Sequence, residues 1–347
     1  MPSPTYRDPF VWHELMTSDV NAALAFYQKV IGWKKQPTPQ DPSYTMLVAK
    51  TGPVAGVMLL PEEAKAMGAP PCWMIYVGTP NVDETSRRAA DLGGSVLRAP
   101  ADIPQVGRFA VLADPQGAAF AVFTPKDASM NPPRADIGGF SWHELATTDW
   151  QAALDFYQRL FGWQKTEVMD MGAMGTYQMY GVDGHTLGGV YNKPASMAAP
   201  PHWLAYIHVP DSKKAAATVK ALGGQVMNGP MEVPGGDWVA QCMDPQGVVF
   251  AVHSTKPAVK AAPAAKKPAA KKPAAKKAAA KKRPAKAKKA AKKRPARKAA
   301  KKRPARKAAK KRVARKPARK ARAPKRAAAR RRKARPRRKA GAKRRRR

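Results

Sequence analysis

The chain has 347 residues and a formal net charge of +42 at pH 7, which is divided very unevenly along its length. Residues 256–347 contain 47 Lys or Arg and no acidic residue, whereas residues 1–255 contain 18 basic and 23 acidic residues, a formal charge of −5. No apolar stretch reaches the roughly 18 residues of a membrane span, the N-terminus lacks a secretory signal pattern, and two cysteines are too few for a disulfide framework. The composition argues against a membrane-spanning or disulfide-rich secreted protein and favours a folded cytoplasmic body with a basic tail.

The body is a tandem duplication. The segment VWHELMTSDVNAALAFYQKVIGW, residues 11–33, aligns with SWHELATTDWQAALDFYQRLFGW at an offset of 130. The same offset relates ADPQGAAFAV to MDPQGVVFAV near the end of each copy, and between these segments it changes to 133, as a difference in loop length would produce. We therefore expect a first module at residues 8–125, a linker at 126–137, a second module at 138–255 and the tail at 256–347.

Each copy contains the same predicted order of helices and strands. In the first copy, a strand from Phe10 to Met16 leads to a helix that begins at Asp19, whose carboxylate can accept the free amides of the first turn, and ends at Gly32. Apolar residues in this helix recur at intervals of three and four, which predicts one buried face. Three strands follow at residues 44–49, 54–60 and 73–77, and a second helix at 83–92. A hairpin around Asp-Pro-Gln-Gly, with strands at 109–113 and 118–123, closes the copy. The predicted local order is β-α-β-β, twice per copy.

The motifs of the two copies resemble those of one protein family. The run D-x6-F-Y-x4-G-W after a strand, and the D-P-x-G turn of the closing hairpin, are similar to the glyoxalase/bleomycin-resistance/dioxygenase group, the vicinal oxygen chelate (VOC) superfamily. The doubled form, with W-x-E-L in the first strand, resembles two-module glyoxalase-like proteins. The resemblance covers residues 8–255 and implies an α+β fold, with two tandem βαβββ modules whose curved mixed sheets form a ligand cup.

The resemblance also indicates where a metal would bind. In metal-dependent members, one ligand lies on the first strand, seven residues before the helix-cap Asp, and another, usually Glu, lies on the last strand, seven residues after the Asp of D-P-x-G. In this chain these positions hold Trp12 and Ala121 in the first copy, and Trp142 and Ala251 in the second. Neither an indole nor a methyl group can donate a lone pair to a divalent cation. The usual metal site is therefore expected to be missing, and no cofactor is favoured.

A strand register shifted by one residue is the alternative to this assignment. It would turn His13 and His143 toward the cup, because successive side chains of a strand face opposite sides. The short spacing from Asp19 to Phe26 favours the unshifted register. In that register we expect the two histidines to point toward the helices and to make structural hydrogen bonds.

The unshifted register turns one carboxyl group and two aromatic side chains per copy into the cup. A Glu held among Trp and Tyr has its pKa raised by desolvation, which suits proton abstraction, so Glu14 and Glu144 are the candidate catalytic residues. Aromatic rings can stack on a planar ligand, although packing alone explains them equally well. The candidate ligand-binding residues are Trp12, Trp142, Tyr76 and Tyr206.

The second copy offers an alternative metal site. Glu144, His208 and His253 share the cup face in the unshifted register, and a carboxylate with two imidazoles can bind Zn, Fe, Ni or Mn. The first copy lacks these histidines, and a set of unrelated polar residues in a pocket is the other interpretation. A divalent metal therefore stays open as a cofactor.

The tail has the composition of a disordered polycation. It contains no Trp, Phe or Tyr, so it cannot bury enough apolar surface to offset the entropy of ordering. Its repeats, such as KKPAA and KKRPARKAA, resemble the terminal domain of linker histone and the basic tails of bacterial histone-like proteins. Each Lys or Arg near a phosphate releases condensed counterion, and without aromatic residues little base specificity is expected. The representative nucleic-acid-binding residues are Lys266, Lys267, Lys292, Arg294, Lys301, Arg303, Lys310, Arg312, Arg344 and Arg347.

Three functions fit this sequence. The leading hypothesis is a nucleoid-associated VOC protein that binds an unknown small molecule in its cup and is tethered nonspecifically to DNA, with RNA as the alternative polyanion. The second is a metal-dependent lyase, isomerase or dioxygenase with its site in the second module. The third is a structural DNA-compacting protein whose body forms a homodimer.

Overall fold

The computed structural model describes residues 9–38, 41–127 and 136–256. All of these described residues fall within one compact unit of the chain. The predicted disordered tail, its nucleic-acid-binding residues and most of the predicted linker lie outside the described residues. Among the helices that the structure does describe, none is long and apolar enough to cross a membrane.

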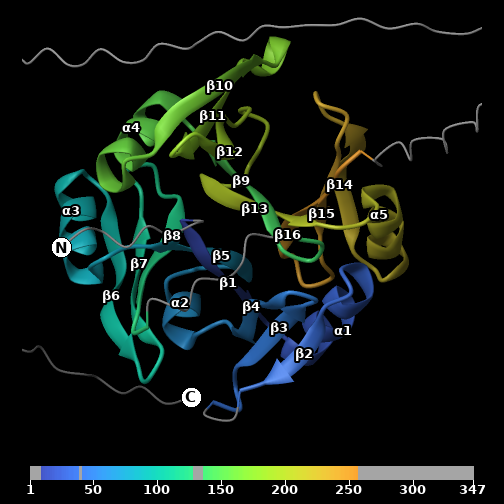
Figure 1. The fold of residues 1–347 in the computed structure, drawn as a ribbon, viewed down its shortest axis with the longest axis horizontal. Coiled ribbons are helices and arrows are strands. Elements are labelled where there is room, and N and C mark those ends of the chain that lie inside the picture. The colour runs from blue at the N-terminus through green and yellow to red at the C-terminus, as the bar shows by residue number, and fades with distance from the viewer. Residues whose placement is uncertain (1–8, 39–40, 128–135, 257–347) are drawn as a thin grey trace, which may run out of the picture. The chain divides into compact units, whose positions relative to one another are not determined.

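The body contains two eight-stranded mixed sheets, one from each repeat (Figure 1). Module 1 consists of β1 (Phe10–Thr17), α1 (Val20–Val30), β2 (Lys34–Pro37), β3 (Thr45–Ala49), β4 (Gly52–Leu59), α2 (Glu62–Ala66), β5 (Cys72–Gly78), α3 (Val82–Asp91), β6 (Ser95–Ile103), β7 (Gly107–Ala113) and β8 (Ala119–Pro125). Module 2 consists of β9 (Phe140–Thr147), α4 (Trp150–Phe161), β10 (Gln164–Asp170), η1 (Gly172–Met174), β11 (Thr176–Val182), β12 (His185–Asn192), β13 (His202–His208), α5 (Ser212–Ala221), β14 (Gln225–Glu232), β15 (Trp238–Met243) and β16 (Val249–Ser254). The sheet orders are β2-β3-β4-β1-β5-β8-β7-β6 and β10-β11-β12-β9-β13-β16-β15-β14.

This architecture confirms the predicted α+β fold class with curved mixed sheets. Each module is itself made of two βαβββ units, from β1 to β4 and from β5 to β8 in module 1. The local prediction missed one strand in each unit, namely β2 and β6 and their equivalents β10 and β14. These strands lie at the sheet edges, and all four residues of β2 are exposed, so they lack the alternation of buried and exposed residues by which a strand is recognised.

The first helix of each module begins as predicted. The Asp19 carboxylate accepts a hydrogen bond from the Ala22 amide at 3.0 Å, and Asp149 caps α4 in the same way. The predicted apolar face of α1 packs against the sheet, and its buried residues are Ala23, Leu24, Phe26, Tyr27 and Val30. Each cap satisfies amides of the first helical turn, directly after the first strand of its module.

Each sheet has a helix side and a second side, which we call the cup face. The helix sides of both modules share one continuous hydrophobic core. On the cup face of module 1, Trp12 packs against a separate cluster that includes Tyr76 and Ala121, and module 2 has an equivalent cluster. Glu14 lies on the cup face with Trp12, whereas His13 is 4% exposed on the helix side. The unshifted register is therefore correct.

The two histidines predicted to be structural connect the modules. His13 Nε2 and His143 Nε2 lie 2.7 Å apart, and the rings stack on Phe140 and Phe10 with centroid distances of 3.5 and 3.6 Å. Burial lowers the pKa of His143 to about 3 and lowers that of His13 as well. Both rings are therefore neutral near pH 7, and one of them donates its proton to the other.

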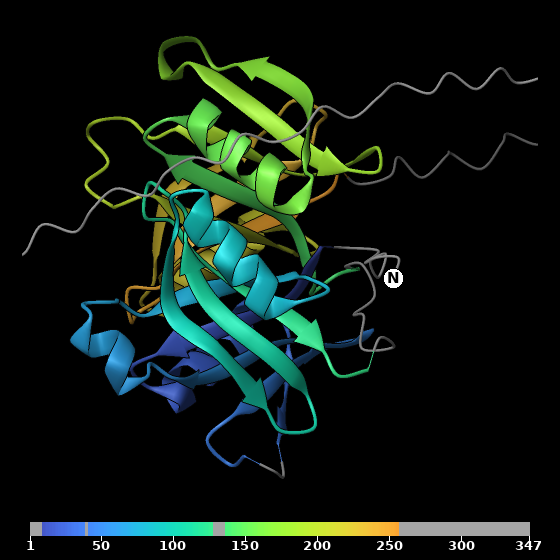
Figure 2. The same ribbon diagram turned by 90° about the vertical axis from the view of Figure 1, so that its left-hand side faces the viewer.

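The closing turn of each module contacts the strand–helix junction of the other module. Gln246 Oε1 accepts from the Thr17 hydroxyl at 2.6 Å and the Asp19 amide at 2.7 Å, and its Nε2 donates to the Asp19 carbonyl at 3.0 Å. Gln116 makes the equivalent contacts with the junction around Asp149. In the same reciprocal way α1 packs against α5, and α3 packs against α4, beside which it lies in Figure 2.

Candidate functional site

Glu144 is the centre of a hydrogen-bonded network on the cup face of module 2. Its side chain is nearly buried, and it accepts hydrogen bonds at Oε2 from the Tyr177 and Tyr206 hydroxyls, at 2.9 and 3.1 Å. Gln241 Nε2 donates to Oε1 at 3.2 Å, and Trp142 Nε1 donates to the Tyr177 hydroxyl at 2.8 Å. The structure therefore joins the predicted Trp142, Glu144 and Tyr206 in one network.

The environment of Glu144 makes its carboxyl group an effective proton donor or acceptor. Burial raises its pKa to about 7, although the hydrogen bonds from Tyr177 and Tyr206 oppose this shift. Burial also raises the pKa of both tyrosines, so their hydroxyls stay protonated donors near neutral pH. A carboxyl group whose pKa lies near the ambient pH is present in both forms, which is the requirement for general acid–base chemistry.

Module 1 repeats this arrangement around Glu14 with different electrostatics. The Tyr76 hydroxyl donates to Glu14 Oε1 at 3.0 Å, and Trp12 Nε1 donates to the Tyr44 hydroxyl at 2.8 Å. Burial raises the pKa of Glu14, while hydrogen bonds from Tyr76 and Tyr44 and the positive charge of Arg98 oppose the shift. The first site therefore has a cation near its carboxyl group, whereas no cation in the described part of the chain shifts the pKa of Glu144.

Three residues of these networks were not found from the sequence, namely Tyr44, Tyr177 and Gln241. Tyr177 lies on β11, and Tyr44 immediately precedes β3. Each tyrosine side chain passes over a glycine to reach the glutamate of its own module. Gly189 is the register partner of Glu144, and a Cβ added to it would collide with the Tyr177 ring. Gly56 has the same relation to Tyr44. The sequence signal was present, because both Tyr–Gly pairs match at the offset of 133.

The positions at which the family resemblance expects metal ligands do not fit a divalent metal. In module 1 the expected positions Trp12 and Ala121 lie on either side of Tyr76, which pairs with Trp12 across β1 and β5 and with Ala121 across β5 and β8. Module 2 places Trp142, Tyr206 and Ala251 in the same relation. An indole, a methyl group and a phenol whose pKa is raised by burial do not form a ligand set for Zn, Fe or Mn.

The alternative metal set of Glu144, His208 and His253 is not brought together. Glu144 is opposite Leu204 in the register of β9 and β13, and His208 lies four residues further along β13. At about 3.3 Å per residue this separation is roughly 13 Å. His208 does lie beside His253, but nowhere in the described ranges do three or more His, Cys, Asp or Glu residues form a group that could hold a metal. The alternative metal set of the second copy is therefore not assembled around Glu144 in this structure.

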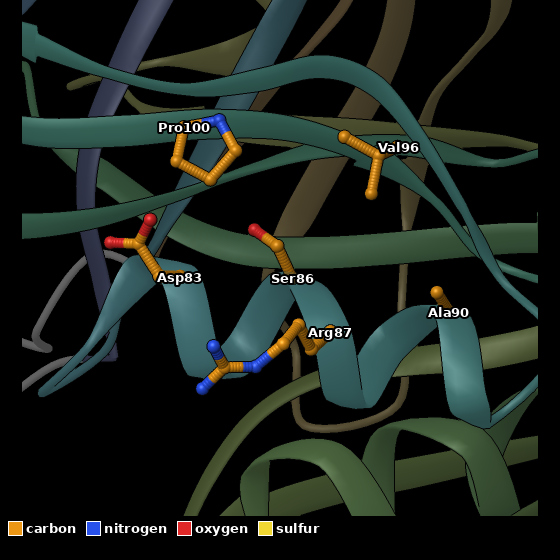
Figure 3. A pocket seen from close by; sticks show the side chains of 6 residues that line it. All are labelled: Asp83, Ser86, Arg87, Ala90, Val96 and Pro100. Carbon is orange, nitrogen blue, oxygen red and sulfur yellow. The ribbon is translucent and has the colours of Figure 1, made fainter.

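A separate pocket lies away from both networks, between α3 and the edge strand β6 (Figure 3). Its volume is about 340 Å³. Asp83 at its rim forms an ion pair with Arg108, with Nε and Oδ2 2.7 Å apart. The lining residues are Asp83, Ser86, Arg87, Ala90, Val96 and Pro100. None of the predicted site residues lines this pocket.

Family models match both modules. Residues 12–123 match a glyoxalase-like domain, and residues 139–252 match the glyoxalase/bleomycin resistance protein/dioxygenase superfamily. CFP32 of Mycobacterium tuberculosis, named provisionally as a glyoxylase, is 31% identical over 250 residues, which are 71% of this chain and 94% of that protein. The anthracycline biosynthesis protein DnrV of Streptomyces peucetius is 30% identical over 265 residues, 72% of this chain and 94% of that protein.

Solved structures show the same fold at low sequence identity. The Mn(II)-bound glyoxalase from Novosphingobium aromaticivorans has a TM-score of 0.51 at 16% identity, over 73% of this chain and 83% of that chain. A variant of homoprotocatechuate 2,3-dioxygenase from B. fuscum has a TM-score of 0.51 at 14% identity, over 72% of each chain. The two family models and the sequence relatives show that the chain belongs to the glyoxalase/bleomycin resistance protein/dioxygenase superfamily.

Proposed function

We propose that the body binds a planar small molecule on the cup face of module 2 and exchanges a proton with it through Glu144. The observation that carries this proposal is the network in which Glu144 is held by Tyr177, Tyr206 and Gln241. The partly exposed Trp142 offers aromatic surface beside the buried Tyr206 and next to a carboxyl group whose pKa is raised to about 7. A ligand with an acidic C–H or O–H group would stack on the Trp142 ring and be deprotonated there by Glu144.

The relatives support a ligand of this kind. DnrV is named for anthracycline biosynthesis, and anthracyclines are planar polycyclic aromatic compounds. CFP32 carries a glyoxylase name, and glyoxalase chemistry moves a proton next to a carbonyl group. Both suggestions match an apolar stacking surface that contains one titratable carboxyl group.

A thermal-shift screen of the full-length chain against planar phenols, quinones and α-hydroxy ketones tests this function. We expect a ligand present at about 100 times its Kd to stabilise the fold by about 2.7 kcal/mol. Trp142→Ala should abolish the shift, whereas Trp12→Ala, at the matching position of module 1, should keep it. The proposal fails if no compound stabilises the chain, or if stabilisation survives both Trp142→Ala and Glu144→Gln.

Elemental analysis of the purified chain separates binding from the metal-dependent alternative. Our proposal expects less than stoichiometric metal and a Glu144→Ala variant with unchanged metal content. One tightly bound metal per chain that is lost in Glu144→Ala would instead favour a metal-dependent lyase, isomerase or dioxygenase.

For the tail, we propose nonspecific attachment of this body to DNA, with RNA as the weaker partner, and hence association with the nucleoid. The support is the charge of residues 256–347, in which 47 of 92 residues are Lys or Arg. Such a segment binds phosphate backbones by releasing condensed counterions. If full-length protein condenses DNA while the ligand screen finds nothing, the structural DNA-compacting alternative is favoured over a tethered ligand-binding protein.

A further inference from the structure

Four polar residues gather at one end of the cup face of module 2, at positions where module 1 has none. Ser141 lies on β9, His208 at the end of β13, Asp237 just before β15, and His253 on β16. The residues 130 positions earlier, in the same order, are Val11, Gly78, Gly107 and Phe123. All four positions therefore differ in chemistry between two modules that otherwise share their fold, and the polar set is not needed to build it.

Three of these residues form a hydrogen-bonded chain. Ser141 Oγ lies 3.0 Å from His253 Nδ1, and His253 Nε2 lies 3.1 Å from Asp237 Oδ2. The other carboxylate oxygen, Asp237 Oδ1, accepts from the Lys256 amide at 2.9 Å. This order of hydroxyl, imidazole and carboxylate is the one by which a serine is activated as a nucleophile.

The hydrogen-bond partners determine which nitrogen of His253 carries the proton. Although partial burial opposes it, hydrogen bonds from the Lys256 amide and from His253 lower the pKa of Asp237, so this carboxylate is ionised and can only accept. His253 Nε2–H therefore donates to Asp237, and in this tautomer Nδ1 carries the lone pair. The Ser141 hydroxyl then donates to Nδ1, and His253 is positioned as its general base.

A β-bulge turns Ser141 toward this cluster. Trp142 pairs with Tyr206 and Phe140 pairs with Ile207, so Ser141 is the extra residue between two consecutive pairs. The bulge in module 1 lies at the same place, and there Val11 packs in the cup-face cluster. Bulges next to active sites commonly re-aim one side chain in this way. The Ser141 side chain is half-buried, so its hydroxyl lies at the border of the cup face.

One further contact competes for the Ser141 hydroxyl. The Tyr206 carbonyl oxygen lies 3.4 Å from Oγ, which is longer than the 3.0 Å to His253. The His208 ring stacks beside that of His253 with a centroid distance of 5.3 Å, and burial, aided by the neighbouring His253, lowers the pKa of His208. A neutral His208 does not compete with His253 for the negative charge of Asp237.

We propose that Ser141, His253 and Asp237 form an acyl-accepting site for small carboxylic esters. Ser141 Oγ attacks the ester carbonyl carbon while His253 Nδ1 takes the hydroxyl proton, and Asp237 stabilises the resulting imidazolium. The carbonyl carbon–alkoxy bond then breaks, His253 returns the proton to the departing alcohol, and the acyl group stays on Ser141. Water, deprotonated by the same imidazole, releases the carboxylic acid and restores the serine. This activity is independent of Glu144 and of the proposed ligand.

Covalent labelling of the full-length chain by a fluorophosphonate probe tests the site. We expect one probe per chain, located at Ser141 by peptide mass spectrometry, because the probe forms a stable bond only with an activated serine. The matched variants replace each residue by its module 1 counterpart, Ser141→Val, His253→Phe and Asp237→Gly, which the same positions of module 1 accept. Ser141→Val should abolish labelling, and His253→Phe should slow it at least 100-fold.

The hydrolysis of p-nitrophenyl acetate gives a second measurement. Because all variants keep the same lysine-rich tail, background acylation of lysine cancels when each variant is compared with the unaltered chain. We expect a burst of p-nitrophenol that is lost in Ser141→Val and reduced in Asp237→Gly. If Ser141→Val does not fold, Ser141→Ala, which removes only the hydroxyl group, replaces it. Absence of label at Ser141, or labelling that His253→Phe leaves unchanged, overturns the proposal.

Discussion

At the scale of single residues, desolvation decides what the two glutamates can do. Glu144 and Glu14 occupy the same position in two copies, and both accept hydrogen bonds from tyrosine hydroxyls. Glu144 is buried with Gln241 as an additional donor, whereas Glu14 is half-buried near the charge of Arg98. Burial raises the pKa of both carboxyl groups, and that of Glu144 to about 7, which is why proton exchange is proposed for module 2.

Replacing Glu144 by Gln should make stability less dependent on pH. The folded-state pKa of Glu144 is about 7 against an ordinary value of 4.5, so the folded chain binds this proton more tightly than the unfolded chain. Its contribution is present below pH 4.5 and is lost as the pH rises through 7, and it amounts to about 3 kcal/mol at 1.36 kcal/mol per pKa unit. Between pH 5 and 8, denaturant unfolding should show Glu144→Gln gaining stability relative to the unaltered chain.

The exposed Glu63→Gln is the control for this series, since its carboxyl group lies in solvent on α2. It should follow the unaltered chain at every pH. Parallel stability curves for Glu144→Gln and Glu63→Gln would show that the burial of Glu144 has no effect on its protonation.

Gly189→Ala should dismantle the network although it substitutes none of its members. The added Cβ collides with the Tyr177 ring, so the tyrosine must leave its position over the strand and lose its hydrogen bond to Glu144. Overpacking of this kind typically costs about 1–3 kcal/mol. Thermal unfolding should record that loss, and the ligand found in the screen should no longer stabilise the chain.

Gly56→Ala is the matched control, because it displaces Tyr44 in module 1. It should cost a similar amount of stability and leave ligand binding in module 2 intact. Equal loss of binding in both glycine variants would mean that the two cup faces act together or that neither is the site.

At the scale of elements, the two family motifs of this chain meet each other across the modules. The turn D-P-Q-G of one module contacts the strand–helix junction that carries the D-x6-F-Y run of the other. Tyr27 also donates to the Asp244 carboxylate, and Tyr157 to that of Asp114, each at 3.2 Å. Residues that look like local turn and cap signals in the sequence therefore also join one module to the other.

Removing one turn glutamine should weaken the connection between the modules. Gln246→Ala removes one amide that accepts from the Thr17 hydroxyl and the Asp19 amide and donates to the Asp19 carbonyl. With a net value of about 0.5–1.5 kcal/mol per hydrogen bond and partial replacement by water, we expect a loss of about 1–3 kcal/mol in denaturant unfolding. Gln116→Ala should behave alike.

Gln151→Ala, in the exposed first turn of α4, is the control and should change stability by less than about 0.5 kcal/mol. If both turn variants were as stable as this control, the glutamine contacts would not hold the modules together.

At the scale of the whole molecule, charge divides the chain into an acidic body and a strongly basic tail. Removing residues 257–347 should abolish nearly all affinity for duplex DNA, because the remaining body carries an excess of acidic residues. For the full-length chain, log Kd should rise steeply with log salt, with a slope of about 0.9 for each phosphate neutralised. Fluorescence anisotropy with duplexes of unrelated sequence measures both effects.

A chain ending at Ala300, which keeps 19 of the 47 tail Lys and Arg residues, should show an intermediate slope. The tail assignment is wrong if the body alone binds duplex DNA as tightly as the full-length chain, or if the slope does not change with tail length.

The sequence by itself determined the duplication and the charge division, and through the family resemblance the fold class. It favoured the unshifted register of the first strand, from the spacing between Asp19 and Phe26, and the pairing of β1 with β5 then placed Trp12 and Glu14 on the cup face. The edge strands escaped prediction because their residues are exposed and carry no periodic signal.

Only the tertiary structure decided which side chains meet. Tyr177 reaches Glu144 across Gly189, and Ser141 reaches His253 through a bulge, over separations of 33 and 112 residues. The same geometry kept His208 and His253 away from Glu144. Strand pairing and side-chain direction set these distances. Because the paired strands are far apart in the chain, a local sequence pattern does not predict which of their side chains come into contact.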